Sequence, residues 1–454
     1  MEISKIKILS SLGITSERTS NIFKQIFFTS IFKGGSVIAN YMLVPITLGY
    51  LDTANYGLWL TITSFVGWFA FFDIGIGNGL RNKYTEAKAN NNLELARSYV
   101  STAYFFICII SILLTIVLFV INSYVNWTLV FNTKSISANE LSKLMFVVIG
   151  FFNLNLVAQL IITIYIADQK AHVAGVLQFL IQSISVIIIW ILSKTISSSL
   201  LIFGTIISGL PVLILFIFTI YSFFNKYKEV IPKFRLVNKS QTNEIFNVGL
   251  SFFILQISCV VLYATDNMII SHFFGPEKVT PYNIAYKYFS IAYILFNIIL
   301  SPYWSGITDA NSKNDFEWIR NSMKYLKKYS YIVILLIFVM YVVSDKVYYL
   351  WIGKSIQIPT LLSILMGIYF SLIVFMQPFV FFVNGTGKIR LQLIFSVITA
   401  VLNIPLSIYF AKDLGFGISG VILSTIMCSI PGVIYVPIQY SKIINKKAKG
   451  IWNK

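Results

Sequence analysis

The chain has 454 residues, of which 57% are hydrophobic and only 11% are charged. Soluble domains carry about 25% charged residues, so this composition excludes a chain that folds mainly in water. The formal net charge of +18 would suit a nucleic-acid-binding protein. No basic stripe or compact binding module accompanies that charge, and we therefore expect no nucleic-acid partner.

Twelve apolar runs are long enough to cross a membrane, since one helical span needs about 20 mostly apolar residues. In chain order they are Phe23–Leu48, Tyr56–Ile76, Tyr99–Ile121, Leu144–Ala167, Val173–Leu192, Leu200–Phe224, Ile245–Phe273, Tyr282–Trp304, Tyr329–Leu350, Pro359–Val383, Ile389–Ala411 and Phe416–Tyr440. Backbone groups in lipid must bond internally, and runs of this length suit helices better than barrel strands. The sequence predicts an all-α polytopic membrane protein with about 12 transmembrane helices.

The connections between these twelve runs are alternately rich and poor in lysine and arginine. Connections on the cytoplasmic side of a membrane carry more lysine and arginine than those on the other side. With both termini placed in the cytoplasm, the inner connections hold more than three times as many of these residues as the outer ones. We therefore expect both termini to be cytoplasmic.

The longest inner connection lies near the middle of the chain and reads NKYKEVIPKFRLVNKSQTNE, residues 225–244. A weak internal repeat relates the parts on either side, because Gly49 and Tyr56 recur as Gly275 and Tyr282, 226 residues later. Transporters often consist of such repeats and bind their substrate between them. The sequence predicts two pseudo-symmetric six-helix bundles, residues 1–228 and 244–454, around a central cavity, with a cytoplasmic linker at 229–243.

Four charged residues lie within spans: Lys33, Asp73, Asp266 and Lys287. All four fall on the first two helices of the two predicted halves. Charges in a bilayer are costly and usually functional, so we interpret them as the lining of a hydrophilic cavity. Two alternatives stay open: Asp266 and Lys287, at the same depth, could form a structural ion pair, and Asp73 could cap a turn.

Two lysines in a cavity favour an anionic guest over a cationic one. Asn40 lies two helical turns after Lys33 and could continue its polar stripe. Tyr41, Tyr263 and Tyr286 occupy the same helices and could stack on sugar faces, although each could equally be a packing residue. The cysteines and histidines are too few and too scattered for a metal site, and we expect no cofactor.

The stretch DIGIGNGLRNKYTEAKANNN, residues 73–92, is rich in glycine. It is no phosphate-binding loop, because no strand precedes it and the GxxxxGK[ST] pattern is absent. We interpret it as a sharp helix exit followed by a short basic amphipathic helix. Arg81, Lys83 and Lys88 would then contact anionic lipid headgroups.

Three stretches carry a family resemblance: residues 73–92 continuing to ARSYVSTAYFF (96–106), PYNIAYKYFSIAYILFNIILSPYWSGITDA (281–310) with NDFEWIR (314–320), and FFVNGTGKIRLQ (381–392). They resemble Wzx-type O-antigen flippases, in the polysaccharide transporter family of the multidrug/oligosaccharidyl-lipid/polysaccharide exporter superfamily. The resemblance implies two six-helix bundles around a cavity open to one side at a time. It also implies movement of an undecaprenyl-diphosphate-linked repeat unit from the inner to the outer leaflet of the bacterial cytoplasmic membrane.

The resemblance further implies roles for particular residues and partners. Lys33 and Lys287 would be the cationic cavity residues, and Asp266, with Asp73, would be the candidate coupling group for a proton or sodium gradient. Other polysaccharide-assembly membrane proteins would be possible partners. Which sugar is carried is not readable from the residues.

Two alternative functions remain open. A multidrug exporter of the same superfamily would favour acidic cavity residues, which the two lysines disfavour. A membrane-embedded polymerase or glycosyltransferase would need a large outer loop with catalytic acids. The longest outer loop, about Asn122–Lys143, has one acid, Glu140, and no DxD-type metal site. We therefore expect a transporter rather than an enzyme.

Overall fold

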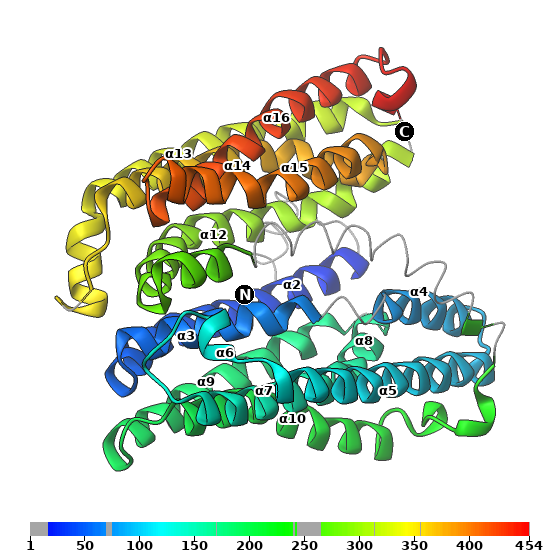
Figure 1. The fold of residues 1–454 in the computed structure, drawn as a ribbon. Helices are drawn as coiled ribbons and strands as arrows, with labels where there is room; N and C mark the ends of the chain where they lie inside the picture. The colour runs from blue at the N-terminus through cyan, green and yellow to red at the C-terminus, as the bar shows by residue number, and fades with distance from the viewer. Residues whose placement is uncertain are drawn as a thin grey trace, which may run out of the picture. The chain divides into compact units, whose positions relative to one another are not determined.

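The computed structural model describes residues 17–453 except 70–74, 169, 239–240, 243–264, 313 and 355. Across this part of the chain the regular elements are all helical, and no strand occurs (Figure 1). The predicted all-α fold class is confirmed.

The helices and short helical turns follow one another with brief connections. They are α2 (Glu17–Tyr50), α3 (Thr53–Gly67), α4 (Ile76–Ala89), α5 (Leu93–Tyr124), α6 (Trp127–Val130), α7 (Ala138–Ala158), α8 (Leu160–Ala167), α9 (Ala171–Thr195), α10 (Leu200–Phe224), η2 (Lys228–Val230), η3 (Phe234–Leu236), η4 (Pro276–Lys278), α12 (Val279–Ser312), α13 (Phe316–Ile352), α14 (Thr360–Thr386), α15 (Arg390–Ile408), η5 (Tyr409–Asp413), α16 (Ile418–Ile444) and η6 (Gly450–Asn453). Residues 265–274 are also helical.

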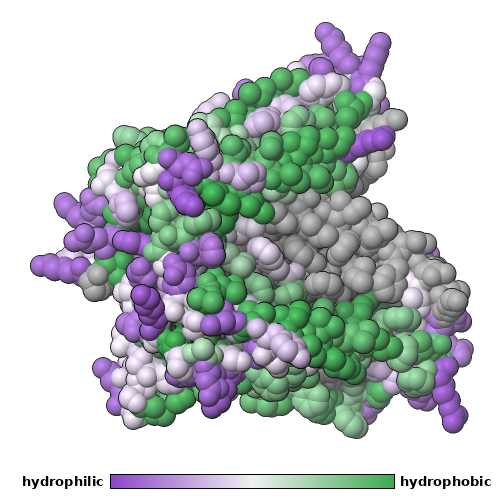
Figure 2. Space-filling model, in the orientation of Figure 1, coloured by the Kyte–Doolittle hydropathy of each residue, from purple (hydrophilic) through white to green (hydrophobic). Residues whose placement is uncertain are grey.

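Ten helical segments of the described chain are long and apolar enough to cross a membrane. They correspond to ten of the twelve predicted spans, from Ile31–Tyr50 to Ile418–Ile444. The other two predicted spans, Tyr56–Ile76 and Ile245–Phe273, run into residues 70–74 and 243–264, which lie outside the described residues. The protein is a multi-pass membrane protein, and hydrophobic surface covers much of the helices in Figure 2.

The chain forms two compact units by its internal contacts. Unit 1 comprises Met1–Tyr50, Phe72–Ser123 and Phe146–Ser251, and unit 2 comprises Leu51–Phe71, Tyr124–Met145 and Phe252–Lys454. Unit 2 therefore contains α3 and α6, which precede the predicted linker. The bundle boundaries at residues 228 and 244 stay predictions.

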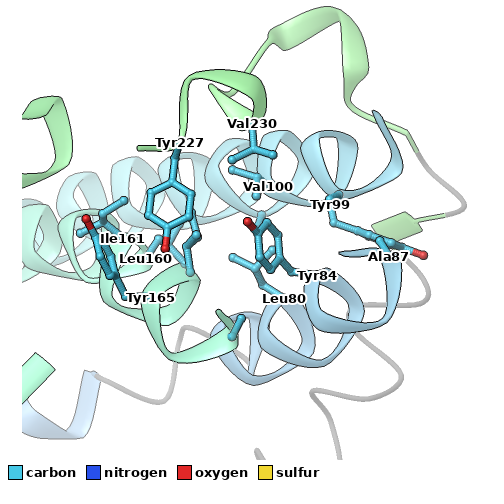
Figure 3. Packing of buried hydrophobic residues seen from close by; sticks show 14 of the residues in the cluster. Leu80, Tyr84, Ala87, Tyr99, Val100, Leu160, Ile161, Tyr165, Tyr227 and Val230 are labelled. Atoms are coloured by element: carbon cyan, nitrogen blue, oxygen red, sulfur yellow. The ribbon is translucent and has the colours of Figure 1, made fainter. Parts of the chain in front are cut away.

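The interior of unit 1 has two parts: the contact between α2 and α9, and a core of aliphatic and tyrosine side chains. Helices α2 and α9 approach closely at Gly35, where an added Cβ would come within 2.7 Å of the Phe179 ring. A second core joins α4, α5, α8 and the segment after α10 (Figure 3). Its buried members include Leu80, Tyr84, Ala87, Tyr99, Val100, Leu160, Ile161, Tyr165, Tyr227 and Val230.

The start of the predicted linker is fastened to α5 within unit 1. Arg97 Nε donates to the carbonyl of Ile231 at 2.8 Å, and the backbone N–H of Lys233 donates to Ser101 Oγ at 2.9 Å. Each bond satisfies a backbone group that would otherwise need water. Residues 231–233 are thus a packed part of unit 1 rather than a free tether.

Unit 2 is built mainly from α12, α13, α14, α15 and α16, with α14 packed against α12, α13 and α16, and α15 packed against α16. Its core is aromatic, with the side chains of Phe289, Phe296, Phe370 and Phe382 almost fully buried. Helix α3 and η4 also contact each other closely, which places α3 against the start of α12.

Candidate functional site

The candidate site described first lies within unit 2, where α3, residues 265–274, α12 and α14 bring polar side chains into an apolar core. Its hydrogen-bonded members are Tyr56, Ser64, Asp266, Asn267, Tyr282, Asn283, Lys287, Tyr293 and Gln377. Buried polar groups are costly unless they are bonded, so this concentration needs a reason.

Helix α3 reaches the site because its first turn is held against η4 and α12. Asp52 caps the helix by accepting from the Asn55 backbone N–H at 2.7 Å, and Thr280 Oγ1 donates to the carbonyl of Thr53 at 2.8 Å. At Gly57 an added Cβ would stand only 1.7 Å from the carbonyl oxygen of Pro276. Only glycine permits this approach, which presents the neighbouring Tyr56 to α12.

Asp266 is the one acid among these hydrogen-bonded residues. The residue is 7% exposed, and its Oδ2 accepts a hydrogen bond of 2.5 Å from the Tyr282 hydroxyl. Its Oδ1 is buried and has no hydrogen-bond partner among the described residues. A buried carboxylate oxygen without a hydrogen-bond partner can still take up a proton or bind a cation.

Lys287 belongs to the same unit but contacts a different tyrosine. Its Nζ donates to the Tyr56 hydroxyl at 3.4 Å. Each of the two charges bonds one of the two tyrosines related by the internal repeat, Tyr282 and Tyr56. A structural ion pair of Asp266 with Lys287 stays a prediction.

Amide side chains form further hydrogen bonds in the same unit. Asn267 Nδ2 donates to Ser64 Oγ at 2.8 Å, and Asn283 Nδ2 donates to Asn267 Oδ1 at 2.7 Å. On α14, Gln377 Nε2 donates to the Tyr293 hydroxyl at 2.7 Å. These residues were not predicted from the sequence, although amides inside predicted spans are a signal that points to them.

Of the predicted aromatic residues, Tyr286 packs edge-on against Phe370, with ring centroids 5.2 Å apart. It is partly buried in unit 2. Tyr263 and Asp73 lie outside the described residues. Their predicted roles stay predictions.

Unit 1 carries the remaining cavity candidates, on α2. Lys33 is exposed, whereas Asn40 and Tyr41 are partly buried. Lys33 and Asn40 are seven residues apart, so they lie on the same face of the helix. Because Lys33 belongs to unit 1 and Lys287 to unit 2, a cavity lined by both stays a prediction.

Helix α4 confirms the predicted helix after the glycine-rich stretch. Gly75 precedes it in the left-handed conformation, with φ of 70°. Arg81 is exposed, Lys83 forms an ion pair of 3.0 Å with Glu86, and Lys88 pairs with Asp168. Contact of these three cations with lipid headgroups stays a prediction. In the described chain, no three histidine, cysteine or acidic residues are grouped to hold a metal ion.

Residues 22–308, more than half of the chain, match the family model described as polysaccharide biosynthesis protein. The chain belongs to this family. Residues 252–409 also match the MatE family model.

Curated relatives of this polysaccharide biosynthesis family member match it over most of their length. A "Putative O-antigen export protein" of Yersinia pseudotuberculosis is 23% identical over 91% of this chain and 94% of its own. A "Putative O-antigen transporter" of Salmonella typhimurium is 24% identical, over 90% of this chain and 94% of its own.

Solved structures similar to this family member are transporters of the MOP superfamily. An inward-facing multidrug resistance MATE family transporter has a TM-score of 0.68 at 15% identity, over 93% of this chain and 96% of its own. An outward-facing one has a TM-score of 0.63 at 16% identity, with the same coverage. At this identity the likeness shows the fold alone.

Proposed function

We propose that this chain is a flippase that moves an undecaprenyl-diphosphate-linked O-antigen or polysaccharide repeat unit from the inner to the outer leaflet of the bacterial cytoplasmic membrane. The observation that carries the proposal is the family match together with relatives named for O-antigen export over nine-tenths of this chain. The alternation of basic connections supports cytoplasmic termini.

The transport cycle that we propose is alternating access. The diphosphate and sugars enter a polar cavity, while the lipid tail stays in the bilayer and the bundles expose the cavity to one side at a time. Repeat-related residues support this view, because Tyr56 and Tyr282 occupy equivalent sequence positions and each bonds one of the charges.

Lys287 and Lys33 would bind the diphosphate. Two unit charges 4 Å apart attract by about 4 kcal/mol at an effective dielectric constant of 20, so two lysines could offset much of the cost of bringing a diphosphate into the membrane. The hydroxyl of Tyr56 holds Lys287 on the α3 side of α12, ready to exchange this partner for an anion. Asn40, Tyr41, Tyr263 and Tyr286 would contact the sugars.

Asp266 would couple transport to a proton or sodium gradient, because its Oδ1 has no hydrogen-bond partner among the described residues. Proton or sodium binding there would neutralise the buried charge. Asp73 is the second candidate for this role, from sequence alone. We further propose that the protein makes and breaks no covalent bond of its substrate, as the transport names of its relatives support.

Multidrug export is the second candidate function. The match of residues 252–409 to the MatE family and the buried acid Asp266 favour it. The relatives named for O-antigen export cover both halves of the chain and favour the first function.

The test is complementation of a bacterial strain that lacks its O-antigen transporter, with surface glycan as the readout. The wild-type chain should restore surface glycan. Lys287→Gln and Lys33→Gln should each lower it by about tenfold or more, since losing one partner of a charge-assisted contact costs about 1.5–3 kcal/mol. Lys324→Gln, at an exposed position of α13, is the matched control and should leave the glycan unchanged.

Two outcomes would count against the proposal. Full surface glycan with both lysine changes, singly and combined, would exclude their role in substrate binding. A strain that gains drug resistance but no surface glycan from the wild-type chain would favour multidrug export instead.

A further inference from the structure

In unit 1, three lysines that are far apart in the sequence meet at a single carboxylate. Lys88 lies near the end of α4, Lys170 directly before α9, and Lys226 two residues after α10. Lys88 pairs with Asp168 Oδ1 and Lys170 pairs with Oδ2, while Lys226 Nζ stands 4.0 Å from Oδ2. These four residues do not include any of the cavity candidates.

Asp168 has little capacity left to neutralise the third lysine. Its side chain is only 7% exposed, and the Tyr227 hydroxyl also donates to Oδ2 at 3.2 Å. Burial works to raise the pKa of Asp168, but its hydrogen bonds to Lys170 and Lys88 and their charges outweigh burial and lower that pKa. The carboxylate therefore stays charged and is already shared between two closer cations.

Lys226 is held in place beside another cation. Its Nζ lies 4.8 Å from the centre of the Tyr165 ring and 5.5 Å from that of Tyr227, close enough for cation–π attraction. Burial and the neighbouring Lys170 lower the pKa of Lys226 to about 8. In Figure 3, Tyr227 is drawn between Tyr165 and Tyr84. An anion at this position would relieve the repulsion between the two ammonium groups.

A pocket opens where these side chains meet. It has a volume of about 260 Å³ and is also lined by Tyr84, Leu93, Glu229 and Val230. One water molecule has a share of about 30 Å³ in the liquid, so the pocket can hold a group several times larger. Even with Glu229 counted, the three lysines exceed the two acids of the lining.

The pocket lies where three candidate membrane spans end. Asp168 and Lys170 stand between two candidate spans, Ala138–Ala167 and His172–Thr195, and Lys226 follows the span Leu200–Phe224. These span ends are on the predicted cytoplasmic side, where lysines near the surface attract anionic lipid headgroups. Lysine also binds phosphate well as a compact point charge.

We propose that the pocket formed by Lys88, Lys170 and Lys226 around Asp168 binds a phosphate group, either of an anionic lipid headgroup or of a soluble phosphate. Asp168 positions Lys88 and Lys170, and Lys226 supplies the cation that the carboxylate leaves least neutralised. The site lies within unit 1 alone, so it does not rest on the proposed transport function.

The test is protection of Lys226 from an amine-acylating reagent in the purified full-length protein, measured by peptide mass spectrometry. In one arm the protein is placed in nanodiscs of phosphatidylcholine with or without phosphatidylglycerol. In the other, inorganic phosphate is added to phosphatidylcholine nanodiscs and compared with chloride at equal ionic strength. A ligand at about ten times its dissociation constant should slow acylation about tenfold by mass action.

Exposed Lys228, two residues away, is the internal reference in every arm. Selective protection of Lys226 by phosphatidylglycerol supports a lipid headgroup, and protection by inorganic phosphate supports a soluble ligand. Equal rates at Lys226 with and without either ligand, relative to Lys228, would overturn the proposal. Lys170→Gln should remove the protection, whereas Lys233→Gln, at another exposed position outside the pocket lining, should not. Protection that persists in Lys170→Gln protein, with normal helix content by circular dichroism, would also overturn it.

Discussion

Unit 1 and unit 2 each bury an aspartate that accepts a hydrogen bond from a tyrosine, yet the two acids differ in their other partners. Asp168 is bonded by Lys88, Lys170 and Tyr227. Asp266 receives one hydrogen bond, from Tyr282, and its other oxygen has no hydrogen-bond partner among the described residues. A carboxylate with both oxygens hydrogen-bonded can hold helices together. A buried carboxylate with an unbonded oxygen costs stability, so a role other than stability must explain its presence.

The lysines of the two units also differ in the partners that they bond. Around Asp168 the cations exceed the acids, and the ones closest to the carboxylate are fixed by it. In unit 2, Lys287 bonds a neutral hydroxyl, that of Tyr56. We infer that Asp168 is mainly structural and that Asp266 is mainly functional, and substitutions can separate these roles.

The largest effect is expected where α3 approaches η4. Gly57→Ala places a methyl group 1.7 Å from the backbone oxygen of Pro276, so α3 must move and carry Tyr56 away from Lys287. We expect a loss of about 3 kcal/mol or more, since overpacking against rigid backbone exceeds the usual 1–3 kcal/mol. Thermal unfolding in detergent measures it.

Gly67→Ala in the same helix is the matched control, because an added Cβ there meets no described atom within 4 Å. It should leave the unfolding temperature nearly unchanged. Equal behaviour of the two alanine variants would show that the approach of α3 at Gly57 is unimportant.

The next effect contrasts the two acids directly. Asp168→Asn should lower stability by about 2 kcal/mol, because it weakens charge-assisted hydrogen bonds and leaves the lysines facing one another. Asp266→Asn should be neutral or stabilising, because it removes a buried charge that has only one hydrogen bond, but it should abolish the gradient dependence of transport. If Asp266→Asn proves the more destabilising of the two, the assigned roles are wrong.

A smaller effect is expected from the hydrogen bond between Tyr282 and Asp266. Tyr282→Phe should cost about 1 kcal/mol, the usual net worth of such a bond or slightly more for a charged acceptor. The cost should shrink when Asp266 is already Asn, and a double-mutant cycle measures this coupling. An equal cost in both backgrounds would mean that the hydroxyl contributes nothing through Asp266.

The smallest effect is a pH dependence at Lys226. Its pKa in the folded protein is about 8, below the ordinary value of 10.5, so the unfolded chain binds more protons between these two values. The contribution of Lys226 to stability is therefore unfavourable below pH 8 and improves as the pH rises through this window. Acylation of Lys226 should show a midpoint near pH 8.

Neighbouring substitutions should move that midpoint in opposite directions. Lys170→Gln removes a nearby positive charge and should raise the pKa of Lys226, whereas Asp168→Asn removes a negative charge and should lower it further. A midpoint that is the same in all three proteins would contradict the cluster geometry.

The spans were predictable from sequence because lipid imposes a length and a composition on every crossing helix. Asp266 and Lys287 were predictable as candidates because charges within spans are rare. Their partners were not, because tyrosines are common in membrane helices. Tyr56 and Tyr282 attracted attention only as markers of a repeat.

The Asp168 cluster could not be predicted because its members lie in connections, where charged residues are ordinary. Only folding brings Lys88, Lys170 and Lys226 to one carboxylate across more than a hundred residues of sequence. Similarly, the hydrogen bond from Lys287 to Tyr56 depends on how closely α3 approaches α12. Gly57 permits that approach because it has no side chain.

The most direct test of the central claim is leaflet exchange in vesicles that contain the purified protein and a fluorescent undecaprenyl-diphosphate oligosaccharide. A membrane-impermeant quencher reports how fast label from the inner leaflet becomes accessible. We expect rapid loss of the protected fluorescence with the wild-type chain and a markedly slower loss with Lys287→Gln. Wild-type vesicles that keep their protected fraction as long as protein-free vesicles would contradict the account.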